Sequence, residues 1–278
     1  MRALTAISAA TKPGFGSDMA KRCNYFWRLL ATAIAFSAFG LGGALFSLSV
    51  FPLLILLIRD PEKRTLLSRR VVQMSFAGFI LLMRALGLLS YRIVGAEKLN
   101  RHGLLILANH PTLIDVVFLI SLLPNADCVV KSSLARNPFT RGPVRASNYI
   151  CNDSSEGLVQ DCIRSLRAGN NLVIFPEGTR TPLDGSLKLQ RGAANIAVRG
   201  KRSITPVTIR CEPRGLAKGQ AWWRIPAKPI RFTIEVGDDL AVEPFTQDCG
   251  EAIAARSLTR HLHEFFLNQS NLHANPGT

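Results

Sequence analysis

Residues 29–58 form a run of thirty residues without a single charge, and this run constrains the fold more than any other feature. About 20 apolar residues in a helix span the hydrocarbon core of a bilayer, so the run predicts a membrane-embedded helical segment. It is too long for the apolar region of a secretory signal, which has about 7–15 residues. A buried helix of a soluble core seldom continues this far without a charge, which leaves that alternative the weaker one.

The flanks of this run suggest its topology. Basic residues stand at both ends, which under the positive-inside rule favours both ends on the cytoplasmic face. A re-entrant bend near Gly40, Gly42 and Gly43 would allow this, and a tilted single span is the alternative. The flanking basic residues are Lys21, Arg22 and Arg28 before the run, and Arg59, Lys63, Arg64, Arg69 and Arg70 after it.

A second apolar segment, residues 75–91, is shorter and contains Arg84. It predicts either an interfacial helix whose arginine reaches lipid phosphates or a helix packed on the folded domain.

The formal net charge of +15 calls for an acidic partner, either nucleic acid or an anionic lipid surface. Zinc-finger spacing, an RNP-like aromatic run and a basic heptad segment are all missing, so the membrane is the better expectation. The six cysteines contain no C-x-x-C pair and no histidine at metal spacing. We therefore expect neither a metal site nor a disulfide scaffold, but ordinary buried thiols.

The rest of the chain alternates short hydrophobic runs with helix-compatible stretches. This alternation predicts an α/β domain with a mostly parallel, layered sheet flanked by helices. The expected strands are 91–95, 103–109, 127–132, 170–175, 203–210 and 229–237, and the expected helices are 112–123, 156–169, 190–201 and 249–269. The predicted organisation is a poorly ordered N-terminus (1–20), a membrane-anchoring helical segment (21–90), the α/β domain (91–269) and a loose tail (270–278).

The stretch "ANHPTLIDVVF" (108–118) places His110 and Asp115 after an expected strand. On one continuous helix the two would lie about 140° apart, so they can meet only if His110 precedes the helix and Pro111 begins it. A histidine held by a carboxylate has a fixed tautomer and a more basic free nitrogen, which suits a general base. The pattern is weak alone, and two polar residues at an ordinary turn are the alternative.

A second polar turn follows the hydrophobic run in "LVIFPEGTR" (172–180). Arg180 suits a phosphate because a guanidinium can donate two parallel hydrogen bonds, and amides exposed at Gly178 could assist. Glu177 and Thr179 add a carboxylate and a hydroxyl, and a surface turn with an Arg–Glu ion pair is the alternative. Both turns end strands of an α/β sheet, where ligands usually bind, so together they predict an active site.

These segments resemble the lysophospholipid and glycerophosphate acyltransferases. "NHPTLID" resembles the family's N-H-x-x-x-x-D block, and "FPEGTR" (175–180) matches its second signature at every position. "KSSLARNPF" (131–139) and "ITPVTI" (204–209) are similar to two further blocks, so the resemblance covers about residues 85–235. Many members carry a phosphate-holding arginine where this chain reads "NYICND" (148–153), and Arg141 or Arg145 could replace it.

The resemblance implies the roles of the site residues. His110 would deprotonate the acceptor hydroxyl, Asp115 would orient the ring, and the alkoxide would attack an acyl thioester without an acyl-enzyme. Arg180, with Glu177, Gly178 and Thr179, would hold the acceptor phosphate. Lys131 is a second candidate for that phosphate, and Arg191 would add positive potential or be structural. The resemblance calls for no metal and no cofactor, with acyl-CoA or acyl-carrier protein as donor.

The expected function is therefore a membrane-bound acyltransferase that acylates a lysophospholipid such as 1-acylglycerol-3-phosphate. We expect it in the cell (inner) membrane, with its active site on the cytoplasmic face. An alternative donor is a carrier-bound aryl-polyene chain, because "YICND", "RGAANIAVR" and "WWRIPAKPIRFTIEVG" are similar to acyltransferases of pigment-lipid gene clusters. Acylation of an amino-lipid such as an ornithine lipid is a smaller possibility. The non-enzyme alternative, a membrane-anchored lipid-binding protein, predicts loss of His110, Asp115 or Arg180, and all three are present.

Overall fold

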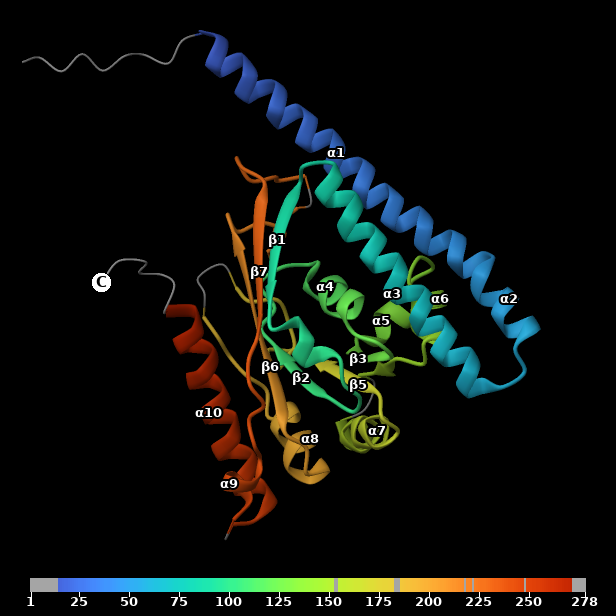
Figure 1. The fold of residues 1–278 in the computed structure, drawn as a ribbon, viewed down its shortest axis with the longest axis vertical. Coiled ribbons are helices and arrows are strands. Elements are labelled where there is room, and N and C mark those ends of the chain that lie inside the picture. The colour runs from blue at the N-terminus through green and yellow to red at the C-terminus, as the bar shows by residue number, and fades with distance from the viewer. Residues whose placement is uncertain are drawn as a thin grey trace, which may run out of the picture.

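The structure is a computed structural model that describes residues 15–152, 155–182, 186–217, 219–221, 223–247 and 249–271. Its centre is a seven-stranded sheet with the strand order β1-β7-β6-β2-β5-β3-β4 (Figure 1). The strands are β1 (Leu89–Val94), β2 (Leu105–Ala108), β3 (Ala126–Val130), β4 (Ile150–Cys151), β5 (Asn171–Ile174), β6 (Ile204–Glu212) and β7 (Ile230–Val236).

Most neighbouring strands run parallel, which confirms the predicted fold class. The exception is β7, which pairs antiparallel with β6. The described residues of the connecting chain, 213–229, contain no crossover helix, and β7 returns beside β6 in the opposite direction. Because β2 and β5 are parallel neighbours, the turns that follow them meet at one edge of the sheet.

Helices cover both faces of the sheet (Figure 1). Successive residues of β2 point to opposite faces: Ile106 and Ala108 join a core with the helices near the N-terminus, and Leu105 and Leu107 join a second core. The first core contains α3 (Pro61–Ala85) and α4 (Asp115–Leu122). The second contains α7 (Ser155–Arg167), α8 (Gly192–Gly200) and α10 (Glu251–Asn271). The short elements are η1 (Ala96–Leu99), α5 (Ser132–Arg136), α6 (Arg141–Ala146) and α9 (Glu243–Thr246).

The N-terminal helices form a hairpin along one side of the domain. The helices α1 (Phe15–Leu48) and α2 (Val50–Leu57) run in one direction and α3 returns beside them (Figure 1). The chain reverses at residues 58–60, where the Asp60 side chain caps α3 by accepting hydrogen bonds from the backbone of Glu62 and Lys63.

Of the two alternatives for this run, a bend at Gly40–Gly43 is not formed, because α1 continues through these glycines. Gly43 instead permits a close approach, since a Cβ there would collide with the carbonyl oxygen of Phe139. Gly142 of α6 serves the same contact from the other side, because a Cβ there would collide with Ser47. These glycines therefore bring the hairpin against the α5–α6 segment rather than bending it.

The boundaries at both chain ends differ from the prediction. The helix α1 begins at Phe15, inside the segment expected to be poorly ordered, and residues 1–14 lie outside the described residues. The helix α10 continues to Asn271, and residues 272–278 of the expected loose tail also lie outside them. Residues 75–85 of the second apolar segment belong to α3 and residues 89–91 begin β1. The helix α3 packs on α4, and its Phe79 ring contacts Phe36 and Phe39 of α1.

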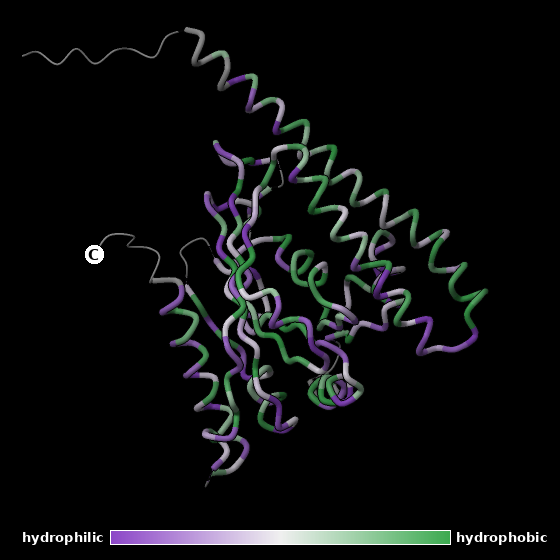
Figure 2. Tube along the Cα trace, in the orientation of Figure 1, coloured by the Kyte–Doolittle hydropathy of each residue, from purple (hydrophilic) through white to green (hydrophobic). Residues whose placement is uncertain are grey.

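The hairpin presents many large apolar side chains to the outside. Arg22–Leu57 and Pro61–Ala85 are both long and apolar enough to cross a membrane (Figure 2). The exposed side chains of α1 recur at helical spacing: Leu30, Ile34, Leu41, Leu45 and Leu48. Its inner face buries Arg28, Ala31, Thr32 and Ala35. This arrangement is the reverse of a surface helix in a soluble protein, whose large apolar residues face the core.

Candidate active site

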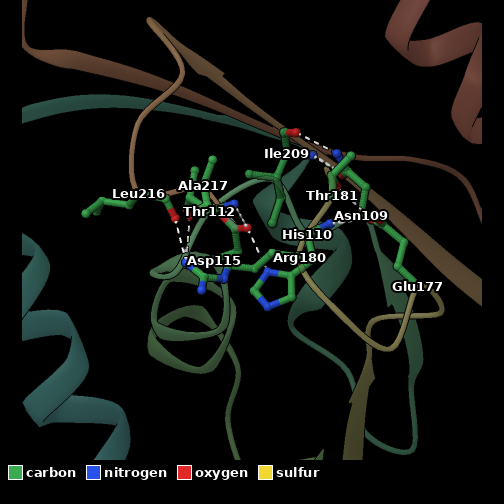
Figure 3. A network of polar contacts seen from close by, with 10 residues as sticks. All are labelled: Asn109, His110, Thr112, Asp115, Glu177, Arg180, Thr181, Ile209, Leu216 and Ala217. Carbon is green, nitrogen blue, oxygen red and sulfur yellow. Dashed lines mark hydrogen bonds and ion pairs between the residues drawn. The ribbon is translucent and has the colours of Figure 1, made fainter. Parts of the chain in front are cut away.

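His110 and Asp115 meet, as the sequence predicts. Asp115 Oδ2 lies 2.9 Å from His110 Nδ1, and its side chain is completely buried (Figure 3). The expected helix start at Pro111 is wrong, because α4 begins at Asp115 itself. Thr112 explains the difference: its backbone N–H donates to Asp115 Oδ2 over 2.6 Å and its hydroxyl donates to Oδ1. These bonds fold residues 112–115 into a turn that carries the carboxylate back to His110.

The imidazole of His110 is fixed from two sides. Its side chain is 18% exposed, and the ring of Phe175 stacks on it with 4.2 Å between ring centroids and 26° between planes. Burial raises the pKa of Asp115, while the hydrogen bond from His110 acts in the opposite direction. An ionised Asp115 accepts the proton of Nδ1–H, which leaves the lone pair on Nε2 for a substrate.

The turn after β5 holds the backbone of His110. Glu177 Oε1 accepts hydrogen bonds from the His110 N–H over 2.8 Å and from the Thr181 hydroxyl over 2.9 Å. The N–H of Thr181 donates to the carbonyl oxygen of His110 over 2.7 Å. Both backbone groups of His110 are therefore bound by residues 177–181. Glu177 is 5% exposed and its carboxylate faces the protein, so its setting differs from that of a phosphate ligand.

Arg180 is oriented by main-chain oxygens. Its Nη1 donates to the carbonyls of Leu216 over 2.9 Å and Ala217 over 3.0 Å (Figure 3). The alternative of a surface Arg–Glu ion pair is not formed, since the described contacts of Glu177 are with His110 and Thr181. Beside Arg180, Gly178 is exposed in a left-handed conformation with φ of 67°, as a tight turn requires.

Asn109 allows the chain to leave the sheet before His110. Its side chain replaces a backbone pair beyond the end of β2: Nδ2 donates to the Ile209 carbonyl over 2.8 Å, and Oδ1 accepts from the Ile209 N–H over 2.7 Å. The backbone groups of His110 are thereby free to bind the 177–181 turn.

The other basic candidates lie outside this network. Lys131 is exposed and follows β3, which β5 separates from β2. Arg191 is exposed at the start of α8, and Arg141 and Arg145 are exposed on α6, which contacts the N-terminal hairpin. In the described part of the chain, no group of three His, Cys, Asp or Glu side chains gathers as a metal site would require.

Sequence reasoning missed several contributors. Thr112 could have been found from the spacing T-x-x-D, the signature of reciprocal side-chain and backbone bonds at a helix start. Thr181 lies one residue beyond the second motif, and Phe175 reads as an ordinary strand residue. The contacts of Arg180 with the carbonyls of Leu216 and Ala217 could not be predicted from the sequence, because every residue has a backbone carbonyl.

The Glu177→Gln variant shows whether the site needs the hydrogen bonds accepted by Glu177 or its negative charge. Glutamine keeps an oxygen that can accept both hydrogen bonds, so we expect kcat within about threefold of the wild-type value. Because burial raises the pKa of Glu177, folding stability should increase as the pH falls through the folded-state pKa. Glu177→Gln should remove this pH dependence and melt at an equal or higher temperature at pH 7 in a thermal scan.

The control is Glu177→Leu, which leaves the N–H of His110 without its acceptor. It should lose activity and about 1–3 kcal/mol of stability. Equal inactivity of the glutamine and leucine variants would show that the negative charge itself is needed.

Comparisons with known proteins match the part of the chain that contains the two site turns. Residues 90–210 match the family model described as Acyltransferase. A Caenorhabditis elegans relative assigned as a 1-acyl-sn-glycerol-3-phosphate acyltransferase is 34% identical over 126 residues, which cover 42% of this chain and 44% of the relative. The Pseudomonas aeruginosa 1-acyl-sn-glycerol-3-phosphate acyltransferase is 28% identical over 145 residues, which cover 50% of this chain and 56% of the relative. The matched part thus spans about half the length of these curated relatives.

A solved structure shares the fold. The 1-acyl-sn-glycerophosphate (LPA) acyltransferase PlsC from Thermotoga maritima matches with a TM-score of 0.65 at 19% identity, over 93% of this chain and 100% of that one. None of the relatives named here points to aryl-polyene lipids. The two site turns both lie within residues 90–210, the segment that matches the acyltransferase family model.

Proposed function

We propose that this chain is a membrane-bound O-acyltransferase that moves an acyl group from a thioester to a hydroxyl of a lysophospholipid such as 1-acylglycerol-3-phosphate. One observation carries the proposal: the His110–Asp115 pair and Arg180 belong to one hydrogen-bonded network at the edge of the sheet. The names of the relatives support the choice of acceptor.

The reaction needs one base and no covalent enzyme intermediate. His110 Nε2 takes the proton of the acceptor hydroxyl as its oxygen attacks the thioester carbonyl. The tetrahedral intermediate collapses, the carbon–sulfur bond breaks, and the imidazolium returns the proton to the departing thiolate. Asp115 holds the ring through Nδ1 and stabilises the transient imidazolium. Acyl-CoA or acyl-carrier protein supplies the thioester, and no metal or other cofactor takes part.

Arg180 binds the acceptor phosphate in this proposal. Its Nη1 is held by two carbonyls, which fixes the plane of the guanidinium, and the rest of the group can donate to phosphate oxygens. Gly178 and Thr179 contribute an amide and a hydroxyl on the same turn, and Glu177 holds the turn against His110. Lys131, which lies outside the hydrogen-bonded network, is a second candidate to bind the acceptor phosphate.

The hairpin of α1, α2 and α3 is proposed as the membrane anchor, with the site at the cytoplasmic face of the inner membrane. Lysolipids and long acyl chains partition into a bilayer, so an enzyme that uses them benefits from lying at the interface. The exposed leucines of α1 support this placement, because they would be a costly surface in water.

Replacing Leu41, Leu45 and Leu48 together with glutamine should release the protein from membranes. These side chains are 69%, 62% and 76% exposed, so the change removes apolar surface without disturbing the core. We expect the partition coefficient in vesicle flotation to fall at least about tenfold. Ile253→Gln on α10, at a residue 61% exposed, is the matched control and should leave binding unchanged. A triple variant that floats like the wild type would contradict the anchor.

Product analysis by mass spectrometry tests the reaction. Isolated membranes containing the protein are offered several lysolipids, each with acyl-CoA and with acyl-carrier protein. A diacyl glycerophosphate product that depends on the chain supports the proposal and identifies the donor. A product formed only from an amino-lipid or only with a polyene chain would replace the proposed substrates, and no product would favour the lipid-binding alternative.

A further inference from the structure

Arg28 is a buried arginine within the apolar helix α1. It is 5% exposed and each of its three nitrogens donates a hydrogen bond: Nη1 to the Pro226 carbonyl (2.8 Å), Nη2 to the Ala227 carbonyl (2.9 Å) and Nε to Asn24 Oδ1 (2.8 Å). Among the described residues, every acceptor of Arg28 is neutral. Burying a guanidinium without a carboxylate is costly, so this contact requires a physical reason.

The carbonyls that Arg28 binds belong to the β6–β7 loop, residues 213–229. The two limbs of this loop touch, because a Cβ on Gly215 would lie 2.9 Å from Pro226 Cγ and 2.9 Å from Ile230 Cδ1. Arg28, Leu216 and Pro226 also line one cavity of only about 30 Å³. The two limbs and α1 therefore meet at one place, where the limb held by Arg28 packs directly against the other.

The other limb holds the active-site arginine. The carbonyls of Leu216 and Ala217 accept from Arg180 Nη1, and the Leu216 carbonyl also accepts from the Leu113 N–H over 3.2 Å. Leu216 has a φ of 56°, a left-handed conformation that a leucine rarely adopts. Such strain persists only where the surroundings fix it, and it concentrates at functional sites.

We propose that Arg28 is a positioning residue for the acceptor phosphate: it fixes the β6–β7 loop against α1, and the loop carbonyls orient Arg180. This inference rests on the proposed role of Arg180 as the phosphate ligand. It gives the membrane hairpin a second task, because one of its helices sets the direction of a group in the active site. Lysine cannot replace Arg28 fully, since one ammonium does not reproduce two parallel bonds to consecutive carbonyls.

The kinetic test compares acceptor and donor separately. Arg28→Ala should raise the KM for lysophosphatidate about tenfold and leave the KM for the thioester unchanged, because only phosphate binding loses orientation. The preference for lysophosphatidate over monoacylglycerol, which lacks the phosphate, should fall by a similar factor. The acceptor KM of Arg28→Lys should lie between those of the wild type and Arg28→Ala. Arg84 is an exposed arginine of α3, and Arg84→Ala should have the KM values of the wild type.

A double-mutant cycle distinguishes positioning from general support. If Arg28 acts through Arg180, Arg28→Ala should have no further effect on acceptor KM in an Arg180→Ala background. Effects that multiply, or an Arg28→Ala variant that changes both KM values alike, would overturn the proposal. If Arg180→Ala alone leaves the preference for phosphate intact, the proposed function of Arg180 fails instead, whatever Arg28 does.

Gly215→Ala provides a second route if Arg28→Ala does not fold. The nearest atoms to the added methyl group belong to Pro226 and Ile230, so it presses the two limbs of the loop apart. The same acceptor-specific increase in KM is expected, and an unchanged acceptor KM in this variant would also overturn the proposal.

Discussion

Alanine at position 110 is expected to lower kcat about 10³-fold, because a positioned general base typically contributes 10²–10⁴-fold. The proton of the acceptor hydroxyl then has no acceptor at Nε2, and the leaving thiolate has no donor. The contacts that hold residue 110 in place are made by its backbone, with Glu177 and Thr181, so the turn should keep its shape. Initial rates with lysophosphatidate and acyl thioester measure the effect.

Two controls accompany this variant. His102→Ala removes an exposed histidine outside the site and should leave kcat unchanged. Vesicle flotation and a thermal scan should show that His110→Ala binds membranes and folds like the wild type. Retention of most activity in a folded, membrane-bound His110→Ala protein would refute the base role.

Alanine at position 69 is expected to cost about 3–5 kcal/mol of folding stability, because it leaves a buried carboxylate unpaired. Arg69 Nη2 lies 2.9 Å from Asp127 Oδ2, with the two side chains 4% and 3% exposed. The same guanidinium donates to the buried Ser147 carbonyl and to the half-buried Asn125 Oδ1, so both of these acceptors also lose a donor. Urea titration in detergent, at fixed detergent concentration, measures the loss.

The charge on Asp127 makes this loss depend on pH. Burial already raises the pKa of Asp127, and Arg69 is the main group that lowers it, so removing Arg69 raises the pKa further. The variant should therefore be more stable at mildly acidic pH than at neutral pH, since stability falls as the pH rises through the folded-state pKa.

Matched variants show whether the buried pair is the cause. Asp127→Asn should restore part of the stability lost in Arg69→Ala, because it removes the unpaired charge. Arg70→Ala removes the exposed neighbour and should change stability by no more than about 0.5 kcal/mol. An Arg69→Ala protein as stable as Arg70→Ala would contradict the expected role of the pair.

The sequence predicted the larger elements of the domain well. Six strands lie within two residues of their expected bounds. The strands β2 and β5 are buried on both faces and leave a continuous hydrophobic run, whereas β7 leaves an alternating pattern. The strand β4 and the helices α5 and α6 were missed, since two to six residues are too few to show a period. The antiparallel direction of β7 was also missed, because the loop before it carries no signal for direction.

The candidate site was predicted in part. The contact between His110 and Asp115 was expected, but its cause is the turn made by Thr112 and not a helix that begins at Pro111. For Arg180, the residue type and the strand end could be read from the sequence. Its orientation could not, since the carbonyls of Leu216 and Ala217 come from a distant loop and any side chain could stand there.

The backbone contacts of His110 have a consequence for protein engineering. Its N–H and its carbonyl are both bound by residues 177–181, although some 70 positions separate the two turns along the chain. The two turns therefore depend on each other for their conformation. A chimaera that takes only one of them from another acyltransferase would misplace the backbone of the histidine. Successful exchanges should carry both turns together, with Asn109 and the β6 backbone that receives it.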